Sequence, residues 1–465
     1  MKDFLSKDTI ANISTPVGKG GIGIIRVSGN KSFGILKKVF FPIARKKENF
    51  EVIFEPSKMI LGKFIINKNE ELDICLAVFF KAPKSYTGED IVEFHMHGGE
   101  IILKEALREI LKYCRASDPG EFTKRAFLNG KIDLMKAESV AGLIDSLTLE
   151  SAKNNLQNLS GKLSKEINLV ENEISDILAE VEVNLDYYDD EDLPEFDEKR
   201  IEGRIQNLKL KIQKFLDSYK VGRILKDGAR VVLAGFPNAG KSTLFNKFLG
   251  FDRAIVSEIP GTTRDTLEEY FNLDGVPVKF VDTAGINEFS VDRIEKLGIA
   301  RSKEEIEKAD LILFLSENKK IEESIKLIEK ENLKPEKILF LITKVDLEKP
   351  SSKRLEAIKS RNLEFLEISS FDDQSIKKLC RVLKEKLVGD SFETESVTIS
   401  TERQKKLLDE AFLDLKESMK NIKKERLEIL AENLRSSLRK ISLLSGKEFT
   451  PDILDLVFKN FCVGK

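Results

Sequence analysis

Tryptophan is absent from the 465-residue chain, and cysteine is scarce. The cysteines lie far apart and form no C-x-x-C pair, which argues against a disulfide framework or a zinc ribbon. They are Cys75, Cys114, Cys380 and Cys462. No run approaches the roughly 18 apolar residues of a membrane span, and the opening MKDFLSKDTIANIST lacks the apolar core of a secretory signal. We therefore expect a cytoplasmic protein with reduced thiols and no membrane association.

The chain also lacks an excess of charge of one sign. Lys and Arg total 77 against 79 for Asp and Glu, so the formal net charge is −2. No global field draws the protein to nucleic acid, and RNA binding would need local patches or a partner. The hydrophobic fraction of 41% and charged fraction of 34% are typical of a globular, helix-rich protein. The length favours two to four domains.

The hydrophobic pattern changes along the chain. Branched and aromatic runs such as IGIIRV and IVEFHM predict an α+β domain over residues 1–120, and amphipathic helical patterns follow over 121–225. Short apolar strands alternate with helices over 226–390, before helical patterns return over 391–465. The predicted fold class is therefore multidomain, with an α+β domain, an all-α domain in two segments, and a Ras-like, doubly wound α/β domain inserted between them.

A glycine-rich motif marks the start of the inserted domain. The segment Gly235-Phe-Pro-Asn-Ala-Gly240-Lys241-Ser242 fits G-x-x-x-x-G-K-[ST] between an apolar strand and a helix. In such a loop backbone N–H groups surround phosphate oxygens, Lys241 neutralises the β- and γ-phosphates, and Ser242 offers a hydroxyl to Mg²⁺. The alternative is a glycine turn ahead of a core helix, which the strand and helix context disfavours.

Two downstream segments complete a GTPase pattern. Asp282 ends a predicted strand and can reach the Mg²⁺ shell, and Gly285 lets its amide approach the γ-phosphate. Thr263, in the loop GTTRD, is placed to reach the same ion. This order and spacing are typical of switch loops ordered by γ-phosphate and Mg²⁺. Because Ile286 follows the Asp-Thr-Ala-Gly segment, the water-positioning Gln of Ras is missing, and another group must orient the attacking water.

Base selection is predicted from Thr343-Lys-Val-Asp346 after the strand ILFLI. A carboxylate at Asp346 accepting both N1–H and N2–H of guanine would leave adenine badly matched, which indicates GTP rather than ATP. The usual pattern has Asn where Thr343 stands, so we expect a weaker ring-nitrogen contact and a weaker brace to the phosphate loop. Ser369 and Ser370 either present a backbone amide to the guanine carbonyl or form a plain turn.

The chain resembles the MnmE (TrmE) family of tRNA modification GTPases along essentially its whole length. The resemblance rests on the Pro-Asn inside the phosphate loop, the GTTRD loop, the segment PGEFTKRAFLNGK at 119–131, the opening segments DTIA and GGIGIIRVSG, and the final Cys-Val-Gly-Lys. The last feature, combined with the N-terminal segments, is specific to the family. The α+β domain over 1–120 is then expected to bind folate and to dimerise.

The resemblance implies a potassium-stimulated GTPase that dimerises across its nucleotide domains. It assigns Glu295 to orienting the attacking water, although spacing alone also fits an exposed helix carboxylate. The expected Mg²⁺ ligands are Ser242 and Thr263, and the expected K⁺ neighbours are Asn238, Ser257, Ile259 and Thr262. The full set of expected GTP contacts is Asn238, Ala239, Gly240, Lys241, Ser242, Thr243, Ser257, Glu258, Ile259, Pro260, Gly261, Thr262, Thr263, Asp282, Thr283, Ala284, Gly285, Thr343, Lys344 and Asp346.

A second site is implied for a folate one-carbon donor, either 5,10-methylenetetrahydrofolate or 5-formyltetrahydrofolate. The resemblance carries its contacts onto Arg26, Glu93, Lys131 and Lys465. A carboxylate for the amidine edge of a pterin and cations for a glutamyl tail are sensible chemistry. The residues alone fit a buried ion pair between Glu93 and a cation equally well. His95 and His97 lack a third metal ligand and are expected to line or support this pocket.

Cys462 is expected to be a catalytic thiol, with its ionised form favoured by the nearby Lys465. The alternative is a small apolar residue packed at a helix end, the class to which Cys75 and Cys380 are assigned.

The predicted function is that of a homodimer acting with the FAD- and NADH-dependent MnmG (GidA) protein as a heterotetramer. Together they would form a 5-(carboxymethyl)aminomethyl-type modification on wobble uridine 34 of certain tRNAs, with GTP hydrolysis driving domain rearrangement. The alternative is a regulatory switch GTPase of the ribosome-assembly type. Such a switch would need neither Cys462 nor the folate segments.

Overall fold

The computed structural model describes residues 8–16, 18–43, 54–186, 196–251, 255–256, 269–282, 304–389, 397–459, 461–462 and 464–465. It describes only the backbone of residues 249–251, 255–256, 269, 282 and 424. The chain divides into two units. One comprises Met1–Ala141, Ser164–Asn172 and Leu438–Lys465, and the other comprises Gly142–Leu163 and Glu173–Ser437.

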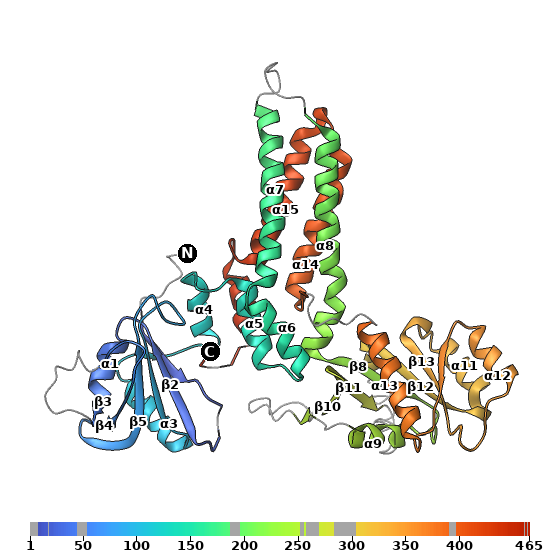
Figure 1. The fold of residues 1–465 in the computed structure, drawn as a ribbon, viewed down its shortest axis with the longest axis horizontal. Helices are drawn as coiled ribbons and strands as arrows, with labels where there is room; N and C mark the ends of the chain where they lie inside the picture. Colours follow the sequence, from blue (N-terminus) through green and yellow to red (C-terminus); the bar gives the residue numbers. More distant parts are fainter. Residues whose placement is uncertain are drawn as a thin grey trace, which may run out of the picture. The chain divides into compact units, whose positions relative to one another are not determined.

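Within the described residues, the first unit is built on a seven-stranded sheet (Figure 1). In spatial order its strands are β3 (Phe40–Pro42), β4 (Met59–Ile66), β5 (Glu70–Phe80), β6 (Ile91–His97), β2 (Ile22–Ser28), β1 (Ile10–Ile13) and β7 (Arg115–Ala116). Because side chains alternate between the faces of a strand, one face carries Phe64 and Phe94, which share a buried cluster with α1 (Ser32–Val39) and α3 (Glu100–Ile110). The predicted α+β class is confirmed.

The end of the chain completes this unit. Phe127 of α4 (Glu121–Leu128), Leu134 of α5 (Leu134–Ile144) and Phe458 of α16 (Pro451–Phe458) belong to one small apolar cluster. At the start of α16 the Thr450 side chain accepts the Ile453 amide, and Pro451 lies in the first turn.

The last residues lie against β1. Ser14 Oγ donates to the Gly464 carbonyl oxygen at 2.9 Å, and the Phe122 amide donates to the Lys465 carbonyl oxygen at 3.1 Å. Gly464 has φ of +90°, and a Cβ there would lie 2.1 Å from the Ile13 carbonyl oxygen. Only glycine therefore allows this close approach.

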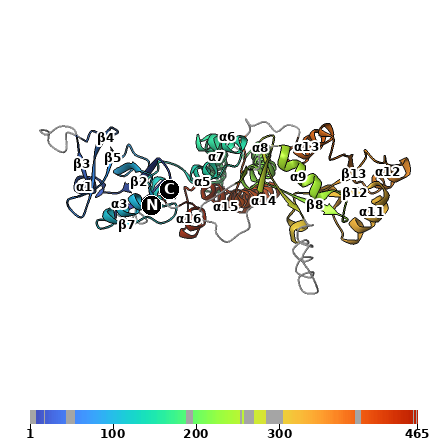
Figure 2. The same cartoon turned by 90° about the horizontal axis from the view of Figure 1, so that it is seen from below.

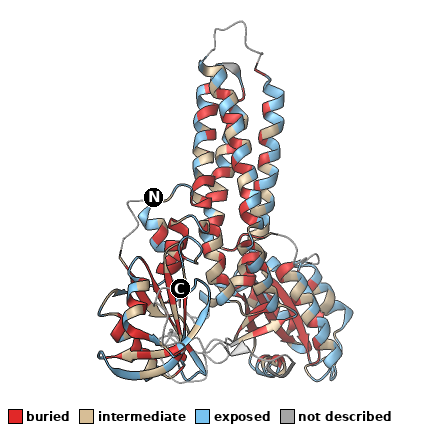
Figure 3. Ribbon diagram, turned by 60° about the vertical axis from the view of Figure 1, so that its left-hand side comes forward, coloured by how far each residue is buried: buried red, intermediate tan, exposed pale blue. Residues whose placement is uncertain are grey.

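The long helices are α6 (Leu149–Leu159), α7 (Lys162–Asp186), α8 (Glu198–Asp227), α14 (Glu402–Ser418) and α15 (Leu427–Ser445). Buried and exposed positions alternate along them (Figure 3), as expected of amphipathic helices. In the second unit α8 packs along α14, and an ion pair of 2.8 Å joins Arg435 of α15 to Glu182 of α7. Short 3₁₀ turns at Met419–Asn421 and Lys424–Arg426 connect α14 to α15. The predicted all-α class is confirmed.

The second unit also contains the inserted α/β fold. Its sheet runs in the order β14 (Glu364–Glu367), β13 (Ile338–Thr343), β12 (Leu311–Glu317), β8 (Ala229–Gly235), β11 (Val276–Asp282), β10 (Glu269–Leu273) and β9 (Ile255–Val256). The strands from β14 to β11 are parallel. Among the described residues its helices include α9 (Lys241–Phe251), α11 (Ile321–Lys330), α12 (Ser352–Lys359) and α13 (Asp373–Val388), with 3₁₀ turns at Asn318–Lys320 and Pro335–Lys337.

These helices cover both faces of the sheet. Residues of α9 and α13 share one buried cluster with the strands, and residues of α11 and α12 share another. Figure 2 shows α13 and α11 on opposite sides of β12 and β13. The doubly wound arrangement predicted from the alternating pattern is therefore confirmed.

We expect Gly464→Ala to detach the last residues from β1, because the added methyl group would clash with the Ile13 carbonyl oxygen. Hydrogen exchange of the Phe122 amide, which the Lys465 carbonyl oxygen now protects, should accelerate at least about tenfold. Gly130→Ala is the matched control, since Gly130 also has positive φ (+69°) but has no atom within 4 Å of its Cβ position. Unchanged exchange in the Gly464 variant would contradict the assigned contact.

Candidate functional site

The predicted phosphate loop lies at the carboxyl end of β8, in the middle of the parallel strands. Gly235 ends β8 with φ of +136°, and a Cβ there would lie 2.1 Å from the Leu315 carbonyl oxygen of β12. Glycine is therefore required for β8 to end so close to its neighbour. At Lys241 the chain begins α9, so the loop leads directly into a helix N-terminus, where exposed N–H groups favour anions.

Lys241 crosses this loop and is 7% exposed. Its Nζ donates to the carbonyl oxygens of Gly235 and Phe236, at 2.9 Å each. Asn238 and Gly240 have left-handed φ values of +65° and +93°, which turn successive backbone groups toward one side. The loop thus presents an ammonium group and backbone N–H groups in one place, as phosphate binding requires. Ser242 and Thr243 are exposed in the first turn of α9.

Thr343 connects the predicted base-recognition segment to this loop. It ends β13, is 3% exposed, and its Oγ1 donates to the Ala239 carbonyl oxygen at 2.9 Å. A second carbonyl oxygen, that of Ser316, lies 3.4 Å from the same hydroxyl. Although we expected a weaker brace from Thr in place of Asn, the hydroxyl does reach the phosphate loop.

The remaining base-recognition residues lie beside Thr343. Lys344 has a left-handed φ of +59° and pairs with Glu317 of β12, and Asp346 is exposed. Ser369 follows β14, the strand next to β13, and its amide donates to Ser375 Oγ at 3.1 Å. The Asp372 amide donates to the Ser369 carbonyl oxygen at 3.2 Å, so this segment forms a turn, and the contact of a backbone amide with the guanine carbonyl stays a prediction.

Several predicted residues are not placed by the structure. Asp282 ends β11 beside Leu233 of β8, but only its backbone is described. The predicted contacts outside the described residues are Ser257, Glu258, Ile259, Pro260, Gly261, Thr262, Thr263, Thr283, Ala284, Gly285 and Glu295. Their roles remain predictions.

The second predicted site lies on the sheet of the first unit. Arg26 of β2 and Glu93 of β6 are paired in register, and Arg26 Nε lies 2.8 Å from Glu93 Oε1. His95 Nε2 lies 3.3 Å from the other carboxylate oxygen. Burial would raise the pKa of Glu93, but the hydrogen bond to His95 and the charge of Arg26 together hold that pKa below its ordinary value. Glu93 is thus a partly buried carboxylate that stays ionised.

Two aromatic rings, which the sequence analysis missed, surround the Arg26 guanidinium. Its carbon lies 5.6 Å from the ring centroids of both Tyr86 and Phe122, within cation–π range. Tyr86 OH forms a hydrogen bond of 2.9 Å with Thr123 Oγ1, which ties its loop to α4. No spacing rule links these residues to Arg26, because the loop, α4 and β2 meet only in the folded unit.

Lys465 lies near this ion pair. Burial, followed by the charge of Arg26, lowers the pKa of Lys465, while Cys462 and Glu93 act against that shift. The structure therefore brings Arg26, Glu93 and Lys465 together as predicted. Cys462 is exposed, so the alternative of a packed apolar residue does not describe it.

Lys131 follows α4 and contacts the loop between β5 and β6 that carries Tyr86. Its side chain is 3.4 Å from the Cβ position of Gly88, and its Nζ donates to the Pro83 carbonyl oxygen at 2.9 Å. His97 is exposed and its Nδ1 lies 2.6 Å from Asp73 Oδ1. Within the described part of the chain, no three His, Cys, Asp or Glu side chains gather as a metal ion would require.

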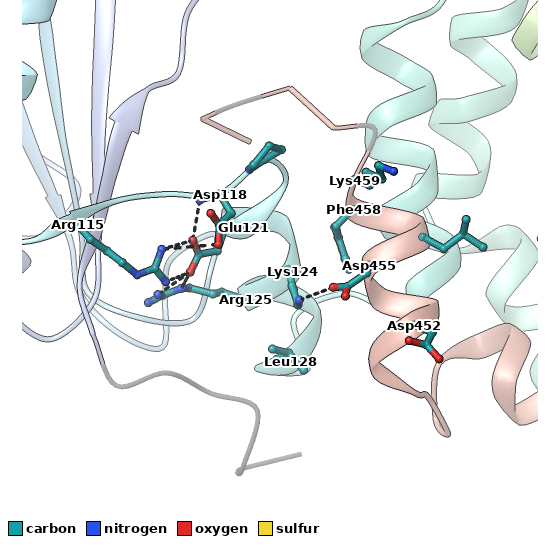
Figure 4. A pocket seen from close by; sticks show the side chains of 12 residues that line it. Arg115, Asp118, Glu121, Lys124, Arg125, Leu128, Asp452, Asp455, Phe458 and Lys459 are labelled. Atoms are coloured by element: carbon teal, nitrogen blue, oxygen red, sulfur yellow. Dashed lines mark hydrogen bonds and ion pairs between the residues drawn. The ribbon is translucent and has the colours of Figure 1, made fainter.

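A cavity of about 700 Å³ beside α4 and α16 contains an ion-pair cluster that the sequence analysis also missed (Figure 4). Arg115 and Arg125 bind Glu121 at 2.6 and 2.9 Å, and Lys124 lies 3.4 Å from Asp455 of α16. Burial would raise the pKa of Glu121, but the hydrogen bonds of the two arginines hold it below its ordinary value. The cluster fastens α4, which frames the second site, to the neighbouring elements.

Comparisons with known proteins cover nearly the whole chain. The family described as "GTP-binding protein TrmE N-terminus" matches residues 9–131, and "MnmE helical domain" matches residues 134–462. A "tRNA modification GTPase MnmE" of Carboxydothermus hydrogenoformans is 40% identical over 99% of this chain and 100% of its own length. Proteins of the same name from Thermotoga petrophila and Caldicellulosiruptor saccharolyticus are 38% and 36% identical, each over 98% of this chain and at least 99% of their own lengths.

Among solved structures, the G domain of the FeoB iron transporter from T. maritima is 27% identical over 34% of this chain and 96% of its own. Its TM-score of 0.26 is too low to support an argument about the fold. No helix among the described residues is long and apolar enough to cross a membrane.

We expect Thr343→Val to raise the dissociation constant for GDP about five- to tenfold, because it keeps the shape of the side chain but leaves the Ala239 carbonyl oxygen without its donor. Thr343→Ser, which keeps the hydroxyl, should bind GDP like the wild type. Isothermal titration calorimetry in the presence of Mg²⁺ measures both constants. Equal affinities for the Val and Ser variants would show that the brace does not support nucleotide binding.

Proposed function

Because the chain belongs to the MnmE family of tRNA modification GTPases, we propose that it hydrolyses GTP as a homodimer and acts in the cytoplasm with a FAD- and NADH-dependent partner. Together they form a 5-(carboxymethyl)aminomethyl-type group on wobble uridine 34 of certain tRNAs. The family predicted from the sequence motifs is confirmed. The proposal of GTPase activity rests on the structure of the phosphate loop. There Lys241 Nζ donates across the turn to the Gly235 carbonyl oxygen, and the Thr343 hydroxyl donates to the Ala239 carbonyl oxygen.

Each group at the nucleotide has a proposed role. Lys241 and the N-terminus of α9 neutralise the phosphates, and the Asp346 carboxylate selects guanine. Ser242, an exposed hydroxyl in the first turn of α9, and Thr263 would hold Mg²⁺, since hard oxygen ligands suit that ion. Bound Mg²⁺ supplies positive charge at the phosphate oxygens.

A second cation is proposed at Asn238. Its side chain is exposed beside Lys241, on a residue whose left-handed φ of +65° turns the loop, so its amide oxygen can serve as a ligand. Ser257, Ile259 and Thr262 would supply the remaining contacts to K⁺. A monovalent cation there would stabilise the charge that develops on the phosphates, and Glu295 would orient the attacking water.

The residues of the second site fit a reduced folate. Glu93 remains an ionised carboxylate that can accept hydrogen bonds from the amidine edge of a pterin. Arg26 and Lys465 supply positive charge near it, and Lys131, in the segment after α4, would supply a further cation for the ligand. The Tyr86 and Phe122 rings offer flat apolar surface. The bound folate would supply the one-carbon unit of the modification.

The homodimer is supported by exposed apolar residues on one face of the first sheet. Large apolar side chains are exposed there, including Leu61 at 49% and Leu76 at 37%. These two residues are paired in register, and Leu76 is also paired with His95. They therefore lie on the same face as the folate-site residues, opposite to α1 and α3. Exposed apolar residues that lie side by side are typical of an interaction surface.

Cys462 is proposed as the reactive thiol of the modification reaction. It is exposed, and its carbonyl oxygen accepts the Gly120 amide at 3.4 Å, which holds it beside α4. A switch GTPase whose only reaction is GTP hydrolysis would not need this thiol.

Replacing K⁺ with Na⁺ should slow GTP hydrolysis about tenfold or more at equal ionic strength, because the smaller ion fits the proposed ligands poorly and charge stabilisation in the transition state is lost. Asn238→Ala should be slow in both salts, while the wild type is slow only in Na⁺. Steady-state phosphate release measures both rates. Equal wild-type rates in KCl and NaCl would remove the proposed role of Asn238.

Cys462→Ser should abolish the modified wobble nucleoside while leaving GTP turnover within about twofold of the wild type, because the thiol lies in the first unit and Lys241 in the second. Mass spectrometry of tRNA nucleosides from cells carrying only the variant measures the modification. Cys114→Ser is the matched control, since burial raises the pKa of that thiol to about 11 and it should be inert. Normal modified uridine in the Cys462 variant would contradict the proposal.

A further inference from the structure

The β10–β11 hairpin joins the two segments that carry the predicted switch motifs. The GTTRD loop precedes β10 in the sequence, and Asp282 at the end of β11 is followed directly by Thr283. The strands are paired from Tyr270 to Leu273 and meet at a two-residue turn. Asp274 and Gly275 have φ of +46° and +94°, as a tight hairpin turn requires. Any displacement of either switch segment therefore acts on one strand of this hairpin.

The turn is held by a residue from outside the α/β fold. Thr148 is the N-cap of α6, and its Oγ1 donates to the Gly275 carbonyl oxygen at 2.7 Å. Thr148 Oγ1 also accepts the Ser151 amide, at 3.2 Å. Thr148 is 6% exposed. One buried hydroxyl thus caps a helix and binds the hairpin at the same time.

Side chains of α6 and α13 contact the hairpin turn from two sides. A Cβ on Gly275 would lie 2.5 Å from Glu150 Cγ of α6, so α6 and the turn are in close contact. On the other side, Lys384 Nζ of α13 donates to the Asp274 carbonyl oxygen at 2.9 Å. The turn therefore lies between α6 and α13, with both of its carbonyl oxygens bonded.

The other end of α6 binds the segment through which the chain leaves the α/β fold. Asn158 Nδ2 donates to the Thr398 carbonyl oxygen at 3.0 Å, and Thr398 Oγ1 donates to Asn154 Oδ1 at 2.9 Å. These three residues are at most 4% exposed. Because the segment at Thr398 is bonded to α6, α6 is not free to follow the hairpin turn when the turn moves. Such a movement must therefore act on the Thr148 contact.

We propose that Thr148 is a positioning residue that couples the state of the nucleotide site to α6. A change in either switch segment displaces the hairpin along its strands, and the hydroxyl of Thr148 transmits that displacement to the first turn of α6. The inference rests on the proposed function for its purpose, since it gives GTP hydrolysis a route to the helical segment. The contact itself does not depend on that function.

The test replaces Thr148 with Asp, Ser or Asn in the full-length protein. Aspartate caps a helix as well as threonine does, but it cannot donate to the Gly275 carbonyl oxygen. Serine and asparagine can both cap α6 and donate. Hydrogen exchange of the Ser151 amide, which Thr148 accepts, is measured with GDP and with a non-hydrolysable GTP analogue. GTP turnover and the modified wobble nucleoside are measured on the same variants.

We expect the wild type and the Ser and Asn variants to show nucleotide-dependent exchange at Ser151. In the Asp variant the difference in Ser151 exchange between the two nucleotide states should be at least about fivefold smaller. Its GTP turnover should stay within about twofold of the wild type, and it should modify less tRNA. The inference is overturned if the Asp variant keeps the dependence, or if its turnover and modification fall in proportion, as general destabilisation would cause. Absence of the modified nucleoside in wild-type cells would reject the proposed function alone, because the exchange measurement does not use tRNA.

Discussion

A single buried hydrogen bond, from Thr343 to the Ala239 carbonyl oxygen, holds together the two halves of the nucleotide site. The segments proposed to recognise the phosphates and the base follow β8 and β13, which are not neighbours in the sheet, since β12 separates them. A nucleotide spans both only if their separation is fixed. The bond fixes it in a buried place where water cannot compete, which makes a small hydroxyl sufficient.

The nucleotide site and the site around Arg26 are built in a similar way. In each, a charged group is held by the backbone or by a register-matched partner, and a glycine allows two segments to approach. Gly235 lets β8 end against β12, and Gly464 lets the end of the chain lie on β1. Lys241 is held by loop carbonyl oxygens, and Arg26 by Glu93 across a strand pair. The charges are thus in position without depending on long, flexible surface side chains.

Much of this arrangement could be predicted from local sequence. The strand and helix that flank the phosphate loop and the strand ending at Thr343 each depend on residues within about one turn or strand, and each is found where expected. α8 ends at Asp227, and Gly228 follows it with φ of +82°.

The contacts that could not be predicted join distant segments. Tyr86 and Phe122 reach Arg26 from a loop and from α4, and Thr148 reaches a hairpin 127 residues away. A hydroxyl or an aromatic ring is equally compatible with a surface position until the fold gives it a partner. The bond from Thr343 to Ala239 belongs to the same class, because comparison with the usual Asn suggested a weaker brace, and only the geometry shows that the shorter side chain reaches.

The bond between Ser14 and Gly464 spans 450 residues, and this has a consequence during biosynthesis. At about 5 to 20 residues per second, a ribosome would need roughly 20 to 90 s after making β1 to produce the residues that lie against it. Throughout that interval the edge of the nascent first sheet near β1 and the groups around Arg26 lack their final neighbour, so molecular chaperones have a defined window in which to shield them.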